Sequence, residues 1–307
     1  MALGTNNTTT TTAAVFIPKL WSDEVVATYK ANLVLANLIK KISFNGKRGD
    51  TLHLPKPTRG AASVKTQGSQ VTLIAATDTE VVVTVNKWYE YSKLIEDIVA
   101  KQALMSMRSF YTEDAGYALA KQVDTDLIQL GRGVQGGTGT AAYSGAFSGA
   151  DGTTAYVAGT NTGLGALTDA AIRRSIQRLD DQDVPMDNRF LIIPPSSRNT
   201  LMGLARYTEQ AFVGEAGGSN TIRTGEIGNL YGVKAYVTSN ADTTSGTTAC
   251  RIALMGHRDS FVLAEQQSVR TQTQYKQEYL GDLFTADTIY GVAELRDLSA
   301  VALAVPA

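Results

Sequence analysis

The chain has 307 residues, of which 43% are hydrophobic, so it can bury one sizeable core or two modest ones without disulfide or metal staples. Its 28 Lys and Arg residues nearly balance its 29 Asp and Glu residues. This balance argues against the strongly basic face of sequence-specific nucleic-acid binders, so we do not expect tight readout of DNA sequence.

Cysteine usage and hydropathy narrow the protein class further. The single cysteine, Cys250, excludes an internal disulfide and a multi-cysteine zinc site and is expected to be a small core residue. The sequence contains neither a signal-peptide pattern nor 18 consecutive apolar residues. We therefore predict no membrane span and a protein that stays in the cytosol in which it is made.

The N-terminal region predicts an arm followed by a helix. Residues 1–12 are nearly all Thr, Asn and small side chains, too poor in apolar groups to offset the entropy of ordering unless a partner helps. An apolar anchor at 15–21 contains Phe16 and Trp21. Apolar side chains then recur at roughly helical spacing, so we expect a helix over 22–40.

Residues 46–87 predict a long hairpin. Strand patterns at 51–54 and 80–85 flank a tip expected near 67–69, and Pro55 and Pro57 are expected to interrupt the pairing, as suits an edge. Each arm of about 20 residues could reach roughly 60 Å, against a radius of gyration of about 19 Å for a compact chain of this length. Because an exposed hairpin of that length invites aggregation, its expected destination is the surface of an identical neighbour.

The outgoing arm of this hairpin is basic. The charges come from Lys47, Arg48, Lys56, Arg59 and Lys65. Two interpretations stay open: a solvated face that discourages edge pairing, or a specific contact with an acidic neighbour.

A long helix is expected over 92–130, because this stretch lacks proline and its apolar residues recur at helical intervals. It could bend near 108–109 or at Gly116. Residues 131–165 are rich in Gly, Ala, Ser and Thr and predict a flexible boundary before a second region.

The second half of the chain predicts a mixed α+β region. Thr168 should cap a helix that ends before Pro185, a strand should follow at 190–193, and Ser196 or Ser197 should cap the next helix. A mobile Gly-rich loop is expected at 214–225. Further strands are expected at 233–238, 251–255, 261–264, 275–280, 286–290 and 299–304, the last three pairing with one another and packing on the long helix.

Catalytic and metal-binding motifs are incomplete. The Gly-x-Gly-x-x-Gly match at 131–136 follows a helix, whereas dinucleotide binding needs it between a strand and a helix. His53 and His257 lie in different predicted regions, and the acidic cluster at 180–187 lacks the glycine and terminal glutamate of a calcium loop. A hydrolase using Ser196 or Cys250 would lack a catalytic partner. We therefore expect no enzyme activity and no cofactor.

The order of parts resembles the major capsid proteins of tailed bacteriophages, the Hong Kong 97-type fold family shared with encapsulins. Local motifs add to this resemblance: LAKQVD at 119–124 before LG at 130–131, DVP at 183–185, RFLIIP at 189–194, IGNLYGV at 227–233 and YG at 290–291. The resemblance covers almost the whole chain.

The resemblance implies a division of the chain into the family's parts. These are an N-terminal arm and first helix (1–43), an extended loop (44–91), the spine helix of a peripheral domain (92–130), a Gly-rich connection (131–165), an axial domain (166–250) and C-terminal strands that complete both domains (251–307). It also implies pentamers and hexamers in an icosahedral shell around packaged double-stranded DNA, with Gly214 and Gly225 near the ring centre and the hairpin over the adjacent subunit. The expected assembly contacts are Phe16, Trp21, Lys47, Arg48, Lys56, Arg59, Lys65, Gly214 and Gly225.

The implied partners are other copies of the chain, a portal protein and DNA contacted without sequence preference, with decoration proteins left open. Because the chain begins at Met1 with a short arm and no long charged helical extension, a separate scaffolding protein is expected. No crosslinking between chains is assumed. The expected location is the virion, after assembly in the host cytoplasm and expansion when DNA is packaged. The alternative is an encapsulin, a cellular compartment, and the contents of the particle would discriminate the two.

Overall fold

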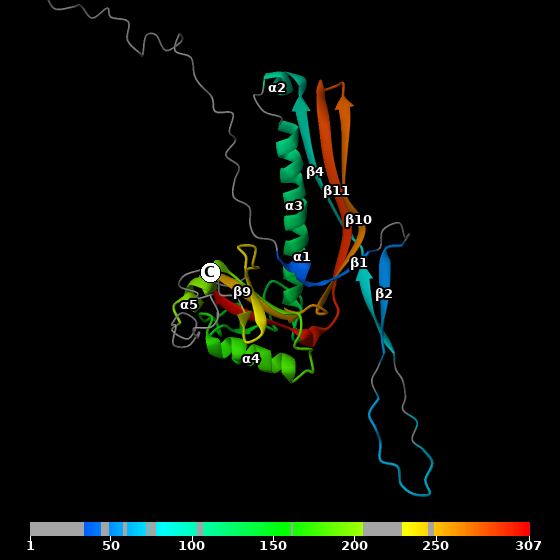
Figure 1. The fold of residues 1–307 in the computed structure, drawn as a ribbon, viewed down its shortest axis with the longest axis vertical. Helices are drawn as coiled ribbons and strands as arrows, with labels where there is room; N and C mark the ends of the chain where they lie inside the picture. The colour runs from blue at the N-terminus through cyan, green and yellow to red at the C-terminus, as the bar shows by residue number, and fades with distance from the viewer. Residues whose placement is uncertain are drawn as a thin grey trace, which may run out of the picture.

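The computed structural model describes residues 34–43, 49–57, 60–71, 73, 78–102, 107–160, 162–204, 229–244 and 249–307. Over these residues the chain forms two larger sheets flanked by helices, with a two-stranded hairpin extending from one end (Figure 1). The α+β class predicted from the sequence is confirmed.

A four-stranded sheet in the order β1-β10-β11-β4 forms the elongated part of the molecule (Figure 1). Its strands are β1 (Lys40–Ser43), β4 (Lys87–Glu96), β10 (Phe261–Lys276) and β11 (Gly281–Glu294). The helix α3 (Met107–Gln129) lies along it, and its 23 residues span about 35 Å. Ala115 and Leu119 of α3 pack against Phe284 and Ala286, which the pleat of β11 turns to this face.

A six-stranded sheet in the order β5-β12-β9-β6-β8-β7 forms the second half of the fold. Its strands are β5 (Phe147–Ser148), β6 (Arg189–Ile193), β7 (Asn229–Leu230), β8 (Val233–Val237), β9 (Cys250–His257) and β12 (Ala300–Pro306). The helices α4 (Asp169–Asp180) and α5 (Pro195–Met202) cover one face. Because β12 alternates along its length, Val301, Leu303 and Val305 pack with these helices, whereas its alanines face the other way.

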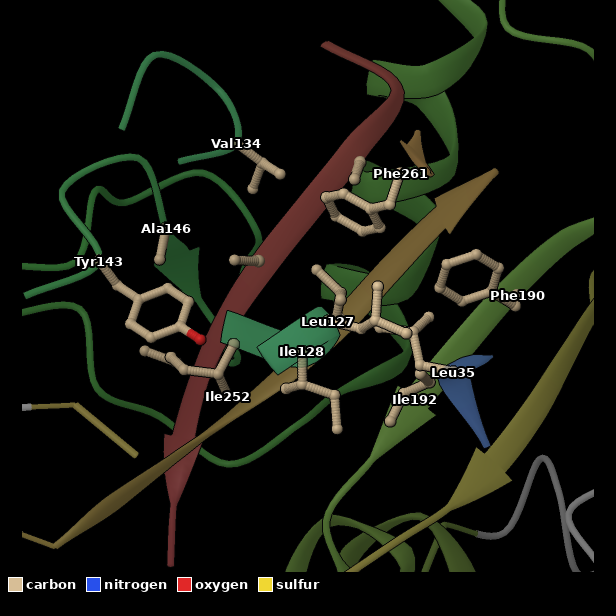
Figure 2. Packing of buried hydrophobic residues seen from close by; sticks show 14 of the residues in the cluster. Leu35, Leu127, Ile128, Val134, Tyr143, Ala146, Phe190, Ile192, Ile252 and Phe261 are labelled. Carbon is tan, nitrogen blue, oxygen red and sulfur yellow. The ribbon is translucent and has the colours of Figure 1, made fainter. Parts of the chain in front are cut away.

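The opposite face of this sheet receives the C-terminal end of α3. Leu127 and Ile128 of α3 pack there with Leu35 of the short helix α1 (Leu35–Leu38) and with Phe190 of β6 (Figure 2). All four side chains are buried. This cluster fixes the long helix to the six-stranded sheet through the hydrophobic effect.

The hairpin contains β2 (Thr51–Lys56) and β3 (Thr79–Thr84), which pair antiparallel. The predicted tip at 67–69 is confirmed as a turn, closed by a hydrogen bond from the Ser69 N–H to the Thr66 carbonyl. Pro55 does not end the pairing, because β2 continues to Lys56. Proline is tolerated here since both strands of a two-stranded sheet are edges.

The predicted helix over 92–130 begins too early. Residues 92–96 belong to β4, followed by the short helix α2 (Asp97–Gln102) and by α3, which is continuous through Gly116. Pairing with β11 decides the conformation of 92–96, because Ser92 and Glu96 lie opposite Thr285 and Gly281. Non-local pairing overrides the local helical spacing.

The predicted helix over 22–40 is wrong at its end, and residues 22–33 lie outside the described residues. Only α1 is helical among 34–40, and β1 begins at Lys40 because it pairs with Val262 of β10. The strand predicted at 299–304 exists as β12, but it belongs to the six-stranded sheet and not to the sheet along the long helix.

Helix caps were predicted with mixed success. Thr168 caps α4 as expected, its hydroxyl accepting from the Ala171 N–H. The expected serine cap of α5 is wrong: Pro194 is the N-cap and Pro195 the first helical residue. The hydroxyl of Ser196 instead donates to the Pro306 carbonyl.

The expectation of a flexible boundary at 131–165 is also wrong for the described part of this segment. Tyr143 and Tyr156 are buried in the core cluster. The Tyr143 hydroxyl donates to Asp242 at 2.8 Å. Two aromatic anchors therefore hold a segment that composition alone assigns to a linker.

Candidate assembly surfaces

The base of the hairpin is part of the folded subunit. Val83 and Val85 are buried against Val262 and Ala264 of β10. The glycine at 291 permits this contact, because a Cβ there would lie 2.5 Å from the Thr84 carbonyl oxygen. The hairpin is thus anchored at its base by packing against the long sheet.

The far end of the hairpin carries exposed apolar side chains. Val64, Val71 and Leu73 are 94%, 70% and 88% exposed. Lys65 lies beside the turn and donates to the carbonyls of Thr66 and Ser69. If another surface covers these side chains, their burial stabilises the contact by roughly 25 cal/mol per Å² of apolar area.

Two of the predicted contact residues can be placed. Lys56 ends β2 and Lys65 lies near the tip, and both are exposed. Phe16, Trp21, Lys47, Arg48, Arg59, Gly214 and Gly225 lie outside the described residues. Their role as contacts stays a prediction.

One face of the long sheet is exposed around Trp88. Tyr89 and Tyr91 turn toward α3, the latter hydrogen-bonded to Asp114 at 3.0 Å, so their neighbours Trp88 and Glu90 point to the opposite face. The Trp88 side chain is 71% exposed.

The residues opposite Trp88 and Glu90 on β11 are Ile289 and Asp287. Arg270 of β10 binds Asp287 through two hydrogen bonds of 3.1 and 2.9 Å. These hydrogen bonds lower the pKa of Asp287 more than any other interaction. Asp287 thereby largely neutralises the charge of Arg270. The exposed carboxylates of β4 on this face are those of Glu90 and Glu96. We call Trp88, Glu90 and Glu96 the Trp88 face.

Sequence reasoning missed the Trp88 face. The alternation of aromatic and polar residues at 87–92 was a usable strand signal, but the helical pattern assigned from residue 92 hid it. Which side of the strand is exposed depends on α3 and β11, which are distant in sequence.

A second exposed apolar group lies at the distal end of the long sheet. Tyr279 and Leu280, in the turn between β10 and β11, are 62% and 65% exposed, and Ile98 of α2 is 58% exposed. Tyr275 of β10 donates its hydroxyl to Asp97 at 2.8 Å. Apolar patches of this kind are typical of surfaces that meet other proteins.

Two buried carboxylates of α3, those of Asp126 and Asp124, bind the helix to the elements around it. Asp126 accepts hydrogen bonds from Tyr290 at 2.7 Å and Gln122 at 3.0 Å and pairs with Lys87 at 3.1 Å. Burial is the largest cause of the raised pKa of Tyr290, followed by its hydrogen bond to Asp126. These contacts join α3 to β4 and β11.

Asp124, two residues before Asp126 and therefore on nearly the opposite side of α3, is fully buried. It accepts from the Leu35 N–H at 2.8 Å and from the Asn240 amide at 3.2 Å. A single carboxylate therefore ties α3 both to α1 and to the loop after β8. Such charge-assisted hydrogen bonds are stronger than neutral ones.

Metal-binding and membrane-spanning features were sought in the part of the chain that the structure describes. No group of three His, Cys, Asp or Glu side chains there could hold a metal ion. His53 lies in the hairpin beside Glu80, whereas His257 is buried in β9. Among the same residues, no helix is both long and apolar enough to cross a membrane.

Comparison with known proteins agrees with this architecture. The family model described as phage capsid protein matches residues 35–295, and the chain therefore belongs to that family. No curated protein sequence matches the chain. The chain is thus a phage head shell protein, and the resemblance noted from the sequence is confirmed.

Solved structures show the fold. A structure from Mycobacterium phage Che8 is 22% identical with a TM-score of 0.73 and covers 94% of this chain and 97% of its own. The capsid of cyanophage P-SCSP1u is 16% identical with a TM-score of 0.73, covering 98% and 96%. The mature capsid of bacteriophage PhiM1 is 14% identical with a TM-score of 0.70, covering 94% and 92%. The chain has the Hong Kong 97-type capsid fold.

Proposed function

We propose that the chain is the major capsid subunit of a tailed phage and assembles into pentamers and hexamers of a closed icosahedral shell around packaged double-stranded DNA. The observation that carries this proposal is the hairpin. Its base is buried in its own subunit, whereas Val64, Val71 and Leu73 near its tip are exposed. Family membership supplies the neighbour that covers them, since a shell surrounds every subunit with copies of itself.

The acceptor for the hairpin is the Trp88 face of the adjacent subunit. The exposed indole of Trp88 offers apolar area to the apolar residues of the hairpin. Lys56 and Lys65 bring positive charge, and Glu90 and Glu96 offer the negative charge that they need. Of the two interpretations of the basic arm, we therefore adopt the specific contact. Single contacts of this kind are weak, and repetition with closed symmetry holds the shell.

The parts of the subunit take the places that the family resemblance implies. The long sheet with α3 forms the peripheral domain, and 166–250 forms the axial domain around the ring centre, with Gly214 and Gly225 close to the axis. Phe16 and Trp21 anchor the N-terminal arm on a neighbour. The C-terminal strands complete both domains, which is consistent with β10 and β11 lying in one sheet and β12 in the other.

The partners of assembly are a separate scaffolding protein, a portal protein and the packaged DNA, held without sequence preference. The near-neutral charge balance supports weak contact with DNA and not readout. Assembly takes place in the host cytoplasm. The role is structural and not enzymatic, which agrees with the incomplete catalytic motifs.

Electron microscopy and light scattering of the purified protein, expressed alone and with an adjacent scaffolding candidate, test this function. Closed particles or tubes tens of nanometres across are expected. Phage DNA inside would support the phage head, whereas enzyme cargo would favour the encapsulin alternative. A stable monomer or dimer under both conditions would contradict the shell function.

A further inference from the structure

The two sheets are joined by a very short connection. β11 ends at Glu294, the 3-10 helix η2 (Asp297–Ser299) follows, and β12 begins at Ala300. This connection links the four-stranded sheet to the six-stranded sheet. Residues 258–260, between β9 and β10, also join the two sheets, and the Ser260 carbonyl of this second connection accepts from the Leu295 N–H of the first at 2.8 Å. A change in the angle between the two sheets would strain both connections.

The segment after α3 closes over this connection. The backbone N–H of Gly136 donates to both carboxylate oxygens of Asp297, at 2.9 and 3.0 Å. The side-chain amide of Gln135 donates to the Ala300 carbonyl at 2.9 Å. The backbone N–H of Gln135 donates to the Asp297 carbonyl at 3.2 Å. Three segments of the fold, the exit from α3, the end of β11 and the start of β12, therefore meet at one point, which we call the joint.

Glu294 lies inside the joint without adequate partners. Its Oε1 is buried and has no hydrogen-bond partner among the described residues. Its Oε2 lies so close to the backbone of Gly133 that a Cβ there would approach it to 2.7 Å. Burial, and after it the charge of the nearby Asp297 carboxyl group and a hydrogen bond between the two carboxyl groups, raises the pKa of Glu294. Two carboxyl groups can share such a hydrogen bond only while one of them carries a proton.

Three arginines lie on the segments around the joint: Arg132, Arg258 and Arg296. Arg132, in the 3-10 helix η1 (Leu130–Arg132) that faces Glu294, is paired with Asp242 at 2.7 Å. Arg296 is exposed, and the turn carrying Arg258 and Asp259 contacts the joint through the Ser260 carbonyl. None of these side chains makes an ion pair with Glu294 among the described contacts.

We propose that Glu294 and Asp297 form a proton-operated latch between the two sheets. With one proton shared, the pair bridges the end of β11 and η2, and the joint is closed. When that proton leaves to solvent, two carboxylates face each other without a cation between them, and the joint loosens. The latch would set how rigidly the peripheral and axial parts of the subunit are held together, a property that the shell function does not itself require.

The working range of the latch follows from the surroundings of Glu294. Burial, and after it the charge of Asp297, raises the pKa of Glu294 from 4.5 to about 7. The folded protein therefore holds an extra proton between about pH 4.5 and 7 that the unfolded chain has released. Stability from this group is full below the unfolded pKa, falls as the pH rises to about 7 and is constant above it.

The test is a comparison of the full-length subunit with Glu294→Gln, which keeps the size and hydrogen bonding of the side chain but cannot ionise. Thermal unfolding from pH 5 to 8 and backbone hydrogen exchange of 130–139 and 294–300, corrected for intrinsic rates, are the readouts. The wild-type melting temperature relative to the variant should fall as the pH rises to about 7, with exchange in both segments increasing. Glu278→Gln, which removes an exposed carboxylate in the turn between β10 and β11, is the matched control and should behave as wild type.

A second variant keeps the proposal testable if Glu294→Gln does not fold. Asp297→Asn removes the opposing charge and should move the transition of Glu294 to lower pH. The latch is overturned if exchange in the joint is independent of pH in the wild type, or if Glu294→Gln or Asp297→Asn leaves the wild-type pH dependence unchanged. Because these readouts are made on the subunit, they do not depend on whether it forms a shell.

Discussion

The six-stranded sheet and the hairpin differ in whether the subunit itself buries their apolar side chains. The sheet is covered on one face by α4 and α5 and on the other by the end of α3, so that Phe190 and Leu127 are almost fully buried. The hairpin leaves Val64 and Leu73 in solvent beyond a buried base. The first region satisfies its apolar residues within one chain, whereas the second needs another copy. Stability of the subunit and assembly of the shell should therefore respond to different substitutions.

Removal of the exposed part of the hairpin should have the largest effect. Lys56 and Thr79 are paired, so 57–78 can be replaced by an Asn-Gly turn that leaves β2 and β3 in register. We expect the subunit to fold with an unchanged circular dichroism spectrum and to form no closed shells by electron microscopy. Full-size shells at normal yield would mean that the hairpin is not an assembly element.

Phe190→Ala should destabilise the six-stranded sheet without removing an assembly contact. Phe190 is 1% exposed in the cluster of Figure 2, and truncation of a buried Phe costs about 3–5 kcal/mol. Denaturant unfolding of the subunit should show this loss, and fewer shells should form only because less subunit is folded. A loss of under about 1 kcal/mol would contradict the packing described for this cluster.

Trp88→Ala should reduce assembly without destabilising the subunit. The side chain is 71% exposed, so its removal should change the free energy of unfolding by no more than about 0.5 kcal/mol. Shell yield should fall several-fold, because a large aromatic anchor is lost at each contact. Tyr231→Ala, an exposed aromatic in the turn between β7 and β8, is the control. Equal yields for both variants would remove the Trp88 face from the interface.

Charge reversal should have the smallest effect. Lys65→Glu should slow assembly at low salt and have less effect at high salt, since exposed ion pairs contribute about 1 kcal/mol or less and are screened. Glu90→Lys in the same chain should restore part of the rate, measured by light scattering. An equally slow double variant would show that these two residues do not face each other.

Local signals predicted the elements that local interactions decide. The cap at Thr168, the buried strand at 190–193 and the turn at 67–69 follow from residue types that favour one conformation. The extent of β4 did not follow, because its last residues are strand only through pairing with β11, nearly 200 positions later in the chain. Tertiary pairing overrides weak local preference.

The candidate contacts show the same limit. Lys56 and Lys65 were identified by charge alone, and the structure places both on the exposed hairpin. Trp88 and Glu294 were missed, since exposure of the first depends on the position of α3, and isolation of the second depends on a fold that brings Gly133 against it. Neither condition leaves a periodic pattern in the sequence.

The central claim, that the hairpin of one subunit lies on the Trp88 face of the next, is tested most directly by engineered cysteines. Because Cys250 is buried, a chain carrying Lys65→Cys and Glu90→Cys presents two accessible thiols. Assembled particles treated with a short bismaleimide should yield, on a denaturing gel, a ladder of covalent oligomers up to five- and six-membered rings. Particles of either single variant should yield only the uncrosslinked monomer band on the same gel. Intact particles from the double variant that yield no ladder would contradict the claim, even with the shell function upheld.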